Sequence, residues 1–166
     1  MDFTIEEMKA SDWKQVADIY LSGIKTEIAT FQSEVPSWEE WNNSHLKLCR
    51  LIARRGDNVL GWTALSPTSS RCVYAGVAEV SIYIGEYHKR QGVGTTLLNA
   101  VIELSEENGF WTLQAGIIKE NSASLNLHKK CGFRELGTRE KIAKMRNGRW
   151  HDVISMERRS KLVGID

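Results

Sequence analysis

The stretch Glu79–Asn108, EVSIYIGEYHKRQGVGTTLLNAVIELSEEN, decides how the rest of this chain is organised. It begins with an apolar, β-branched run at Val80–Ile84, which is typical of a strand. A basic turn with two glycines follows at His88–Gly94. Apolar side chains then recur at helical spacing, at Leu97, Leu98, Val101, Ile102 and Leu104. Asn108-Gly109 is a typical helix end, so the stretch predicts a strand, a glycine turn and a helix.

This arrangement of elements is suited to binding an anion. The first backbone N–H groups of a helix have no internal partner, and the helix dipole places partial positive charge there. Glycines let an anion approach those groups, and Lys89 and Arg90 add positive charge nearby. The turn is not a Walker A loop, and Leu97 stands where a dinucleotide fingerprint would need a third glycine. A tight turn that only packs a helix on a sheet is the structural alternative.

The composition indicates one globular domain of ordinary size. The chain has 166 residues and a net charge of +1, which gives no reason to expect a nucleic-acid or membrane partner. Cys49, Cys72 and Cys131 are widely spaced, which fits free thiols in a reducing compartment, and no leader is apparent, so we expect a cytoplasmic protein. We expect a domain at 1–158 and a tail at 159–166, with no metal site.

Hydrophobic periodicity and turn signals predict the element order βααβββαβαββ. The strands are expected at 3–5, 48–54, 59–65, 73–84, 111–117, 133–145 and 149–157. Besides the helix that follows the glycine turn, helices are expected at 13–24, 38–48 and 121–130. This order implies an α/β fold: a mixed sheet with helices on both sides.

Several local signals refine this prediction. Ser37 and Glu40 have capping-box spacing, so a helix should begin between them. Asn147-Gly148 predicts a tight hairpin between the last two strands. Gly76, inside the strand predicted at 73–84, suggests a bulge or a close approach of another segment. Trp62 could lie in the core or at an edge.

Two titratable residues are candidates for proton transfer. Glu79 opens the strand Val80–Ile84, where partial burial would raise the affinity of its carboxylate for a proton and suit it to act as a base. A glutamate facing water at a strand edge is the alternative. His128 lies seven residues after Asn121, on nearly the same helix face, and could transfer a proton near neutral pH. A satisfied structural histidine is the alternative there.

Other residues could bind ligands or could be structural. Asn121 can cap its helix and can also present its amide to a ligand. Arg71 can hold a carboxylate that Tyr74 orients, although a solvated arginine and a core tyrosine are equally simple interpretations. Phe31 can form an apolar wall or be part of the core. His151 and Asp152 are adjacent in a predicted strand and point to opposite faces, so a catalytic dyad is not expected.

Two spacings in the chain resemble those of the GCN5-related N-acetyltransferase (GNAT) superfamily. The first is Lys89-x-x-Gly92-x-Gly94 after a strand. The second is Asn121-x-x-Ser-x-x-x-His-x-x-x-Gly-Phe, which begins 27 residues after Gly94. The resemblance implies the GNAT acyl-CoA N-acyltransferase fold and a turn that cradles the pyrophosphate of acetyl-CoA. Lys89 stands where the superfamily usually has Gln or Arg, and a lysine lacks the guanidinium fork.

Within the superfamily, most of the chain resembles the phosphinothricin N-acetyltransferases and their relatives that acetylate methionine sulfoximine and sulfone. Four segments carry this resemblance: Thr30-Phe31 with Pro36 and Trp38; Arg71-x-x-Tyr74-x-x-x-x-Glu79-x-Ser81-x-Tyr83; Asn121-x-x-Ser124-x-x-x-His128; and Gly148-x-Trp150-His151-Asp152. Ser69 stands where the phosphinothricin enzymes carry a lysine, two residues before the equivalent of Arg71.

The resemblance implies a role for each of these positions. Glu79 would be the base, and His128 occupies the place where many members carry a general-acid tyrosine. The coenzyme would be held by Ile82, Tyr83, Ile84, Lys89, Arg90, Gln91, Gly92, Val93, Gly94, Thr95, Asn121 and Ser124. The amino-acid pocket would be lined by Phe31, Arg71, Tyr74, Ser81 and Tyr83. Acetyl-CoA is the implied cosubstrate and a homodimer the implied assembly. The alternatives are an acetyltransferase for polyamines or peptide N-termini, and a non-catalytic acyl-CoA sensor.

Overall fold

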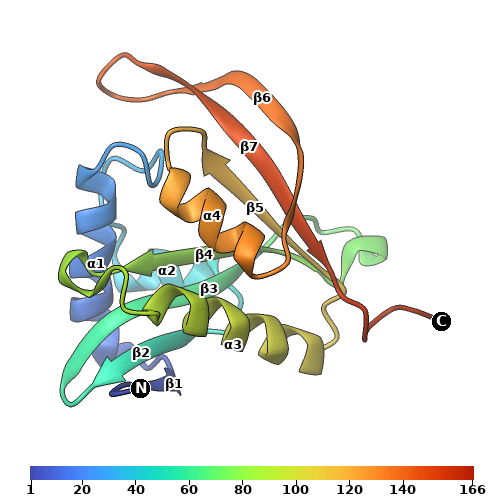
Figure 1. Ribbon diagram of the computed structural model, residues 1–166, viewed down its shortest axis with the longest axis horizontal. Helices are drawn as coiled ribbons and strands as arrows, with labels where there is room; N and C mark the ends of the chain where they lie inside the picture. Colours follow the sequence, from blue (N-terminus) through green and yellow to red (C-terminus); the bar gives the residue numbers. More distant parts are fainter.

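A computed structural model describes residues 1–166 as a seven-stranded mixed sheet flanked by helices (Figure 1). The strand order across the sheet is β1-β2-β3-β4-β5-β7-β6. The strands are β1 (Thr4–Glu7), β2 (Leu51–Arg55), β3 (Asn58–Pro67), β4 (Val77–Ile84), β5 (Thr112–Ile118), β6 (Arg134–Lys144) and β7 (Trp150–Arg159). The helices are α1 (Trp13–Lys25), α2 (Trp38–Ser44), α3 (Val93–Glu107) and α4 (Ser122–Lys130). The predicted order βααβββαβαββ is confirmed.

The helices cover both faces of the sheet, and each face has its own core. The larger core lies beneath α3, where Leu97, Leu98 and Val101 pack against Leu65 and Leu113 of the sheet. The smaller one lies beneath α1 and α2 and contains Val16, Ile19, Trp41, Ile52 and Trp62, among others. Trp62 is fully buried, so it belongs to the core rather than to an edge. The mixed sheet with helices on both sides is therefore the predicted one.

Helix α2 ends earlier than predicted, at Ser44 instead of residue 48. The Ser37–Glu40 capping box forms as expected, but His45 has an extended backbone and leaves the helix. The cause is a side chain that follows the helix in the sequence. The buried guanidinium of Arg50 donates hydrogen bonds to the carbonyl oxygens of Asn42, His45 and Leu46, at 2.9, 3.1 and 2.5 Å. These bonds wrap residues 45–50 into a loop.

Strand β4 begins later than predicted because a turn of 3-10 helix occupies Cys72–Tyr74. Gly76 therefore precedes the strand, and the predicted bulge inside it is absent. The close approach is present: a Cβ atom on Gly76 would lie 2.1 Å from the Trp111 ring, whose residue also donates its N–H to the Gly76 carbonyl. Only glycine fits this contact, which fixes how β4 and β5 come together.

Strands β4 and β5 pair only over a short distance and then separate. The parallel pairing joins Val77–Glu79 to Thr112–Gln114, whereas both strands continue for several residues beyond it. Figure 1 shows β5 diverging from β4 and lying with the β6–β7 hairpin in the upper part of the molecule. The Asn147-Gly148 turn of that hairpin forms as predicted, with Gly148 at φ +87°. The split opens the sheet at its centre.

The final residues continue from β7, which reaches Arg159, two residues further than predicted. The Arg159 guanidinium donates to the carbonyl oxygens of Ser160 and Val163 at 2.9 and 2.8 Å. A separate tail at 159–166 stays a prediction. The helices are all too short or too polar to cross a lipid bilayer.

Candidate active site

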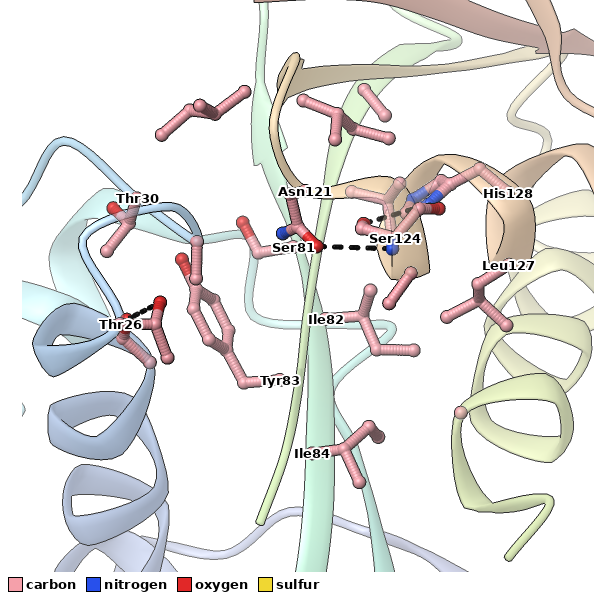
Figure 2. A pocket seen from close by; sticks show the side chains of 18 of the residues that line it. Thr26, Thr30, Ser81, Ile82, Tyr83, Ile84, Asn121, Ser124, Leu127 and His128 are labelled. Carbon is pink, nitrogen blue, oxygen red and sulfur yellow. Dashed lines mark hydrogen bonds between the residues drawn. The ribbon is translucent and has the colours of Figure 1, made fainter. Parts of the chain in front are cut away.

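A cavity of about 1260 Å³ lies where β4 and β5 separate. Its walls are the chain between α1 and α2, strand β4, the glycine turn, the end of β5 and helix α4. The predicted site residues that line it are Phe31, Glu79, Ser81, Ile82, Tyr83, Ile84, Lys89, Arg90, Gly92, Gly94, Thr95, Asn121, Ser124 and His128. Figure 2 shows lining residues on both sides of β4: Thr30 and Tyr83 lie on one side, and Ser124 and His128 lie on the other.

Alternation along β4 divides this cavity into two halves. Glu79, Ser81 and Tyr83 point to the face covered by α1 and α2, because Tyr83 packs with that core and successive residues of a strand alternate. Ile82 and Ile84 pack against the core beneath α3. One strand therefore carries a polar row toward the loop at 26–32 and an apolar row toward α3 and α4.

The backbone of β4 offers hydrogen-bonding groups to the open side of the sheet. Gly85 donates its N–H to the Leu60 carbonyl at 2.8 Å, so Gly85 and Leu60 form a hydrogen-bonded pair of the antiparallel β3–β4 ladder. Bonded and non-bonded pairs alternate, so Ile84 (opposite Gly61) and Ile82 (opposite Thr63) direct N–H and C=O away from β3. Strand β5 no longer pairs at these rows, and these groups face the cleft.

The glycine turn positions the first turn of α3 at the other end of the cavity. Gly92 has φ +81° and Arg90 has φ +60°, both in the left-handed region that favours glycine. The first α-helical bond runs from Thr96 N–H to the Gly92 carbonyl at 3.0 Å. The N–H groups of Val93, Gly94 and Thr95 precede it, so no carbonyl within the helix accepts from them.

The side chains of the turn differ in what they contact. Lys89 pairs with Glu86 at 2.5 Å, which neutralises part of its charge. Gln91 donates to the Tyr87 carbonyl at 2.9 Å, and Val93 is buried in the core beneath α3, so neither side chain lines the cavity. A Cβ atom on Gly94 would lie 3.2 Å from a methyl group of Leu127. Gly94 therefore sets how closely α4 approaches the turn.

Helix α4 presents a row of polar side chains to the cavity. Asn121 caps the helix, as predicted, by accepting the Ser124 N–H at 3.2 Å. His128 is buried, and its Nδ1 donates to the Ser124 carbonyl at 2.7 Å, because a carbonyl can only accept. Burial lowers the pKa of His128, so the ring is neutral at pH 7 and its Nε2 carries a lone pair.

Glu79 is the carboxylate of the cavity's polar row on β4. Its side chain is open to solvent within the cavity, yet the surrounding protein displaces enough water to raise the pKa of the carboxyl above its usual 4.5. The positive charge of Arg139 opposes this shift without cancelling it. Burial likewise raises the pKa of Tyr83, which stacks on Tyr20 at 4.9 Å. Both groups favour their protonated forms more than they would in water.

Residues of the last hairpin lie beside this half of the cavity. Phe31 is half-exposed and makes an edge contact with the His151 ring, at 6.2 Å between ring centres. His151 Nδ1 pairs with Glu120 at 3.2 Å, whereas Asp152 accepts the Lys141 N–H at 2.8 Å. The two adjacent residues face different partners. A His151–Asp152 dyad is absent, as predicted.

Arg71 and Tyr74 lie outside the cavity lining. Both are exposed, and the Arg71 guanidinium sits over the Tyr74 ring at 5.6 Å. Residues 71–74 belong to the loop and the turn of 3-10 helix before β4, which the sequence had placed partly in the strand. A role for the pair in binding an acceptor carboxylate stays a prediction.

Some cavity residues were missed by the sequence analysis. His45 lines the cavity, but the sequence analysis had placed it inside a helix predicted at 38–48. Tyr20 lies in the helix predicted at 13–24, and its ring reaches the cavity beside Tyr83. Neither residue has a local sequence signal, because tertiary contacts bring both to the cavity.

Comparisons with known proteins agree with this geometry. The sequence matches the acetyltransferase (GNAT) family over residues 13–133. Phosphinothricin N-acetyltransferase of Streptomyces viridochromogenes is 30% identical over 153 residues, 90% of this chain and 83% of that protein. L-methionine sulfoximine/L-methionine sulfone acetyltransferase of Pseudomonas aeruginosa is 30% identical over 99 residues, 60% of this chain and 57% of that protein.

A solved structure supports the fold. The crystal structure of a GNAT superfamily phosphinothricin acetyltransferase from Sinorhizobium meliloti, in complex with AcCoA, has a TM-score of 0.89 to this chain at 24% identity. The match covers 100% of this chain and 92% of that one. Taken together, the split sheet, the glycine turn and the sequence matches define an acetyltransferase that uses acetyl-CoA as its cosubstrate. The chain belongs to the acetyltransferase (GNAT) family, in the phosphinothricin and methionine sulfoximine acetyltransferase branch.

Proposed function

We propose that this protein transfers acetyl from acetyl-CoA to the α-amino group of a small amino acid or analogue, of the phosphinothricin, methionine sulfoximine or methionine sulfone type. The observation that carries this proposal is the division of one cavity by β4. Free backbone groups and a helix N-terminus lie on one side, and a carboxyl with a raised pKa lies on the other. An acyl carrier and an amine can therefore meet at the same strand.

The half of the cavity on the α3 and α4 side of β4, the coenzyme half, would bind the acyl carrier. Ile82 and Ile84 offer N–H and C=O groups to the pantetheine arm, which would add to the sheet as an extra strand. The N–H groups of Val93, Gly94 and Thr95 would hold the pyrophosphate, aided by the helix dipole. Asn121 and Ser124 lie on the α4 side of the same cavity, where they reach the pantetheine arm.

The reaction proceeds by direct transfer in a ternary complex. Glu79, directly or through a water, takes a proton from the substrate ammonium, and the free amine attacks the thioester carbonyl. A backbone N–H stabilises the oxyanion that forms. The C–S bond then breaks, and the second proton of the amine nitrogen passes to the departing thiolate of CoA. Because no covalent enzyme intermediate forms, the buried Cys131 should be dispensable.

His128 is the proposed source of the proton that the thiolate takes up. Its Nδ1 proton is committed to the Ser124 carbonyl, and its Nε2 bears a lone pair at neutral pH. The ring can therefore deliver a proton from Nε2 only after receiving one, and that proton is the second one released by the amine nitrogen. His128 therefore relays a proton during the reaction and is not protonated before the reaction begins.

The assembly and setting are further parts of the proposal. We propose a homodimer, because the β6–β7 hairpin exposes the large apolar side chains of Leu136, Ile142 and Trp150 at the edge of the sheet. The three free cysteines fit a cytoplasmic enzyme. Detoxification of amino-acid analogues is the role that this substrate class suggests.

A thiol-release assay with acetyl-CoA and a panel of acceptors tests the proposed function. The panel contains phosphinothricin, methionine sulfoximine, methionine sulfone, a polyamine and a short peptide with a free N-terminus. Turnover confined to the amino-acid analogues is expected. If only the polyamine or only the peptide is acetylated, the proposed substrate class is wrong and that amine is the acceptor. Binding of acetyl-CoA without thiol release across the panel would favour a sensor.

A further inference from the structure

His45 is a cavity residue for which the proposed reaction has no use. It lies at the first extended position after α2, and its loop is joined to β3 by a hydrogen bond from Leu46 N–H to the Leu65 carbonyl at 2.8 Å. The next residue of β3, Ser66, pairs with Glu79 across the sheet and also lines the cavity. His45 therefore belongs to the acceptor half, at the row that holds the proposed base.

The orientation of the imidazole ring is fixed by two contacts. The ring stacks on Trp41 with 4.2 Å between ring centres and an angle of 19° between planes. Nδ1 lies 2.8 Å from the Trp41 carbonyl, which can only accept, so Nδ1 carries the proton. Both hydrogen bonds of the ring are made at Nδ1, so the other ring nitrogen, Nε2, has no partner in the protein, and His45 lines the cavity. The ring thus presents a lone pair to whatever occupies the acceptor half.

The loop that carries His45 is held by hydrogen bonds, and its surroundings disfavour the charged form of the ring. The buried Arg50 guanidinium holds the carbonyl oxygens of Asn42, His45 and Leu46, and lies 4.9 Å from the centre of the Trp41 ring. Burial and the nearby charge of Arg50 both lower the pKa of His45, while the bond to Trp41 opposes them. The imidazole therefore stays neutral at pH 7, and its Nε2 acts as an acceptor.

We propose that His45 determines acceptor specificity: its Nε2 accepts a hydrogen bond from a neutral N–H or O–H donor on the acceptor's side chain. The inference rests on the proposed function and narrows its substrate class. Acceptors with a neutral donor at the end of the side chain are favoured. An anionic group such as a phosphinate is disfavoured, because its oxygens would face the lone pair of a neutral ring.

Methionine sulfoximine and methionine sulfone form a matched pair of probes for this proposal. They differ only at one position, where the sulfoximine has N–H and the sulfone has oxygen. A single neutral hydrogen bond gives a factor of about ten in this setting. We expect kcat/KM of the wild-type enzyme to be about tenfold higher for the sulfoximine than for the sulfone, with phosphinothricin below the sulfoximine.

Two variants assign that ratio to His45. His45→Phe keeps a ring to stack on Trp41 but removes the acceptor, and it should bring the sulfoximine-to-sulfone ratio to about one, with most of the change in KM. His45→Gln restores an acceptor oxygen and should recover part of the ratio. Acetyl-CoA affinity, measured by calorimetry, should match wild type in both and serves as the check on folding.

The outcomes separate this inference from the proposed function. Turnover of both probes at equal kcat/KM by the wild-type enzyme would overturn the role of His45 and leave the proposed function standing. The same holds if the wild-type preference survives in His45→Phe. If His45→Phe fails to fold, the sulfoximine-to-sulfone ratio of kcat/KM in the wild type and in His45→Gln tests the proposal. A ratio of about ten in the wild type that is smaller in His45→Gln supports it, and an equal ratio in both contradicts it. A lack of turnover with every amino-acid analogue would overturn the proposed function and this inference with it.

Discussion

Glu79 pairs with Gln114 in the last row that joins β4 to β5. The residue proposed as the base therefore stands at the point where the sheet splits. Beyond it, β4 has free backbone groups on its β5 side, which are what an extended pantetheine arm needs. The base and the coenzyme cleft are positioned by the same strand, so the distance between them is set by a rigid element rather than by a loop.

Replacement of this carboxyl tests its proposed role. Glu79→Gln keeps the size of the side chain but removes its capacity to take a proton. We expect kcat to fall by about 10²- to 10⁴-fold, the usual contribution of a general base, with acetyl-CoA affinity unchanged. Steady-state kinetics and calorimetry measure the two quantities. Glu103→Gln, on the exposed side of α3, is the matched control and should behave as wild type. A Glu79→Gln enzyme with near wild-type turnover would remove Glu79 from the mechanism.

The pH profile provides a second test of the same group. Burial raises the pKa of Glu79, so kcat/KM should increase as pH rises through that pKa, above the usual 4.5. The raised pKa of Glu79 also contributes to the stability of the folded protein, but with the opposite pH dependence. This contribution is complete below the pKa of the unfolded chain and is lost as pH rises through the higher pKa of the folded state. Glu79→Gln should therefore lose the acidic limb and should not be less stable than wild type at neutral pH. A limb that persists in the variant belongs to another group.

The glycine turn should be sensitive to a single added methyl group. Gly94→Ala would place a Cβ atom 3.2 Å from a methyl group of Leu127, which would have to shift by a few tenths of an ångström beside the first turn of α3. If the added methyl costs the pyrophosphate one hydrogen bond to a helix N–H, the Kd for acetyl-CoA should rise about tenfold. Gly137→Ala is the control, since nothing lies within 4 Å of its added Cβ. Equal coenzyme affinity in both variants would contradict the assigned coenzyme site.

Arg71 provides a test of how the acceptor carboxylate is held. Arg71→Ala should raise KM for the amino-acid acceptor about tenfold and leave KM for acetyl-CoA unchanged, because a charged hydrogen bond would be lost. Both constants come from one set of initial-rate measurements. The exposed position of Arg71 over Tyr74 makes the opposite result informative. Unchanged constants would mean that another group binds the carboxylate, and equal changes in both would point to a structural effect.

Local signals were sufficient for much of the fold. The strand, glycine turn and helix of Glu79–Asn108 were predicted because their signals lie next to one another in sequence. The Asn147-Gly148 hairpin and the Asn121 cap were predicted for the same reason. The suitability of this turn for an anion followed from the same segment, whereas acetyl-CoA was implied by the resemblance to the GNAT superfamily.

Specific side-chain contacts account for what the sequence did not predict. Helix α2 ends early because Arg50 binds carbonyl oxygens up to eight residues before it, and this places His45 in the cavity. The close approach of Trp111 to Gly76 joins two residues far apart in the chain. Hydrophobic periodicity predicts neither the Arg50 hydrogen bonds nor the approach of Trp111 to Gly76. The acceptor half of the site is therefore less predictable than the coenzyme half.

Amide hydrogen exchange with and without acetyl-CoA tests the central claim most directly. If the carrier adds to β4 and its pyrophosphate sits at the start of α3, exchange should slow at Ile82 and Ile84 and at Val93, Gly94 and Thr95. The amides of β6, at the far edge of the sheet, should be unaffected. Unchanged exchange in β4 and at the start of α3 under saturating acetyl-CoA, or slowing confined to another region, would contradict the account.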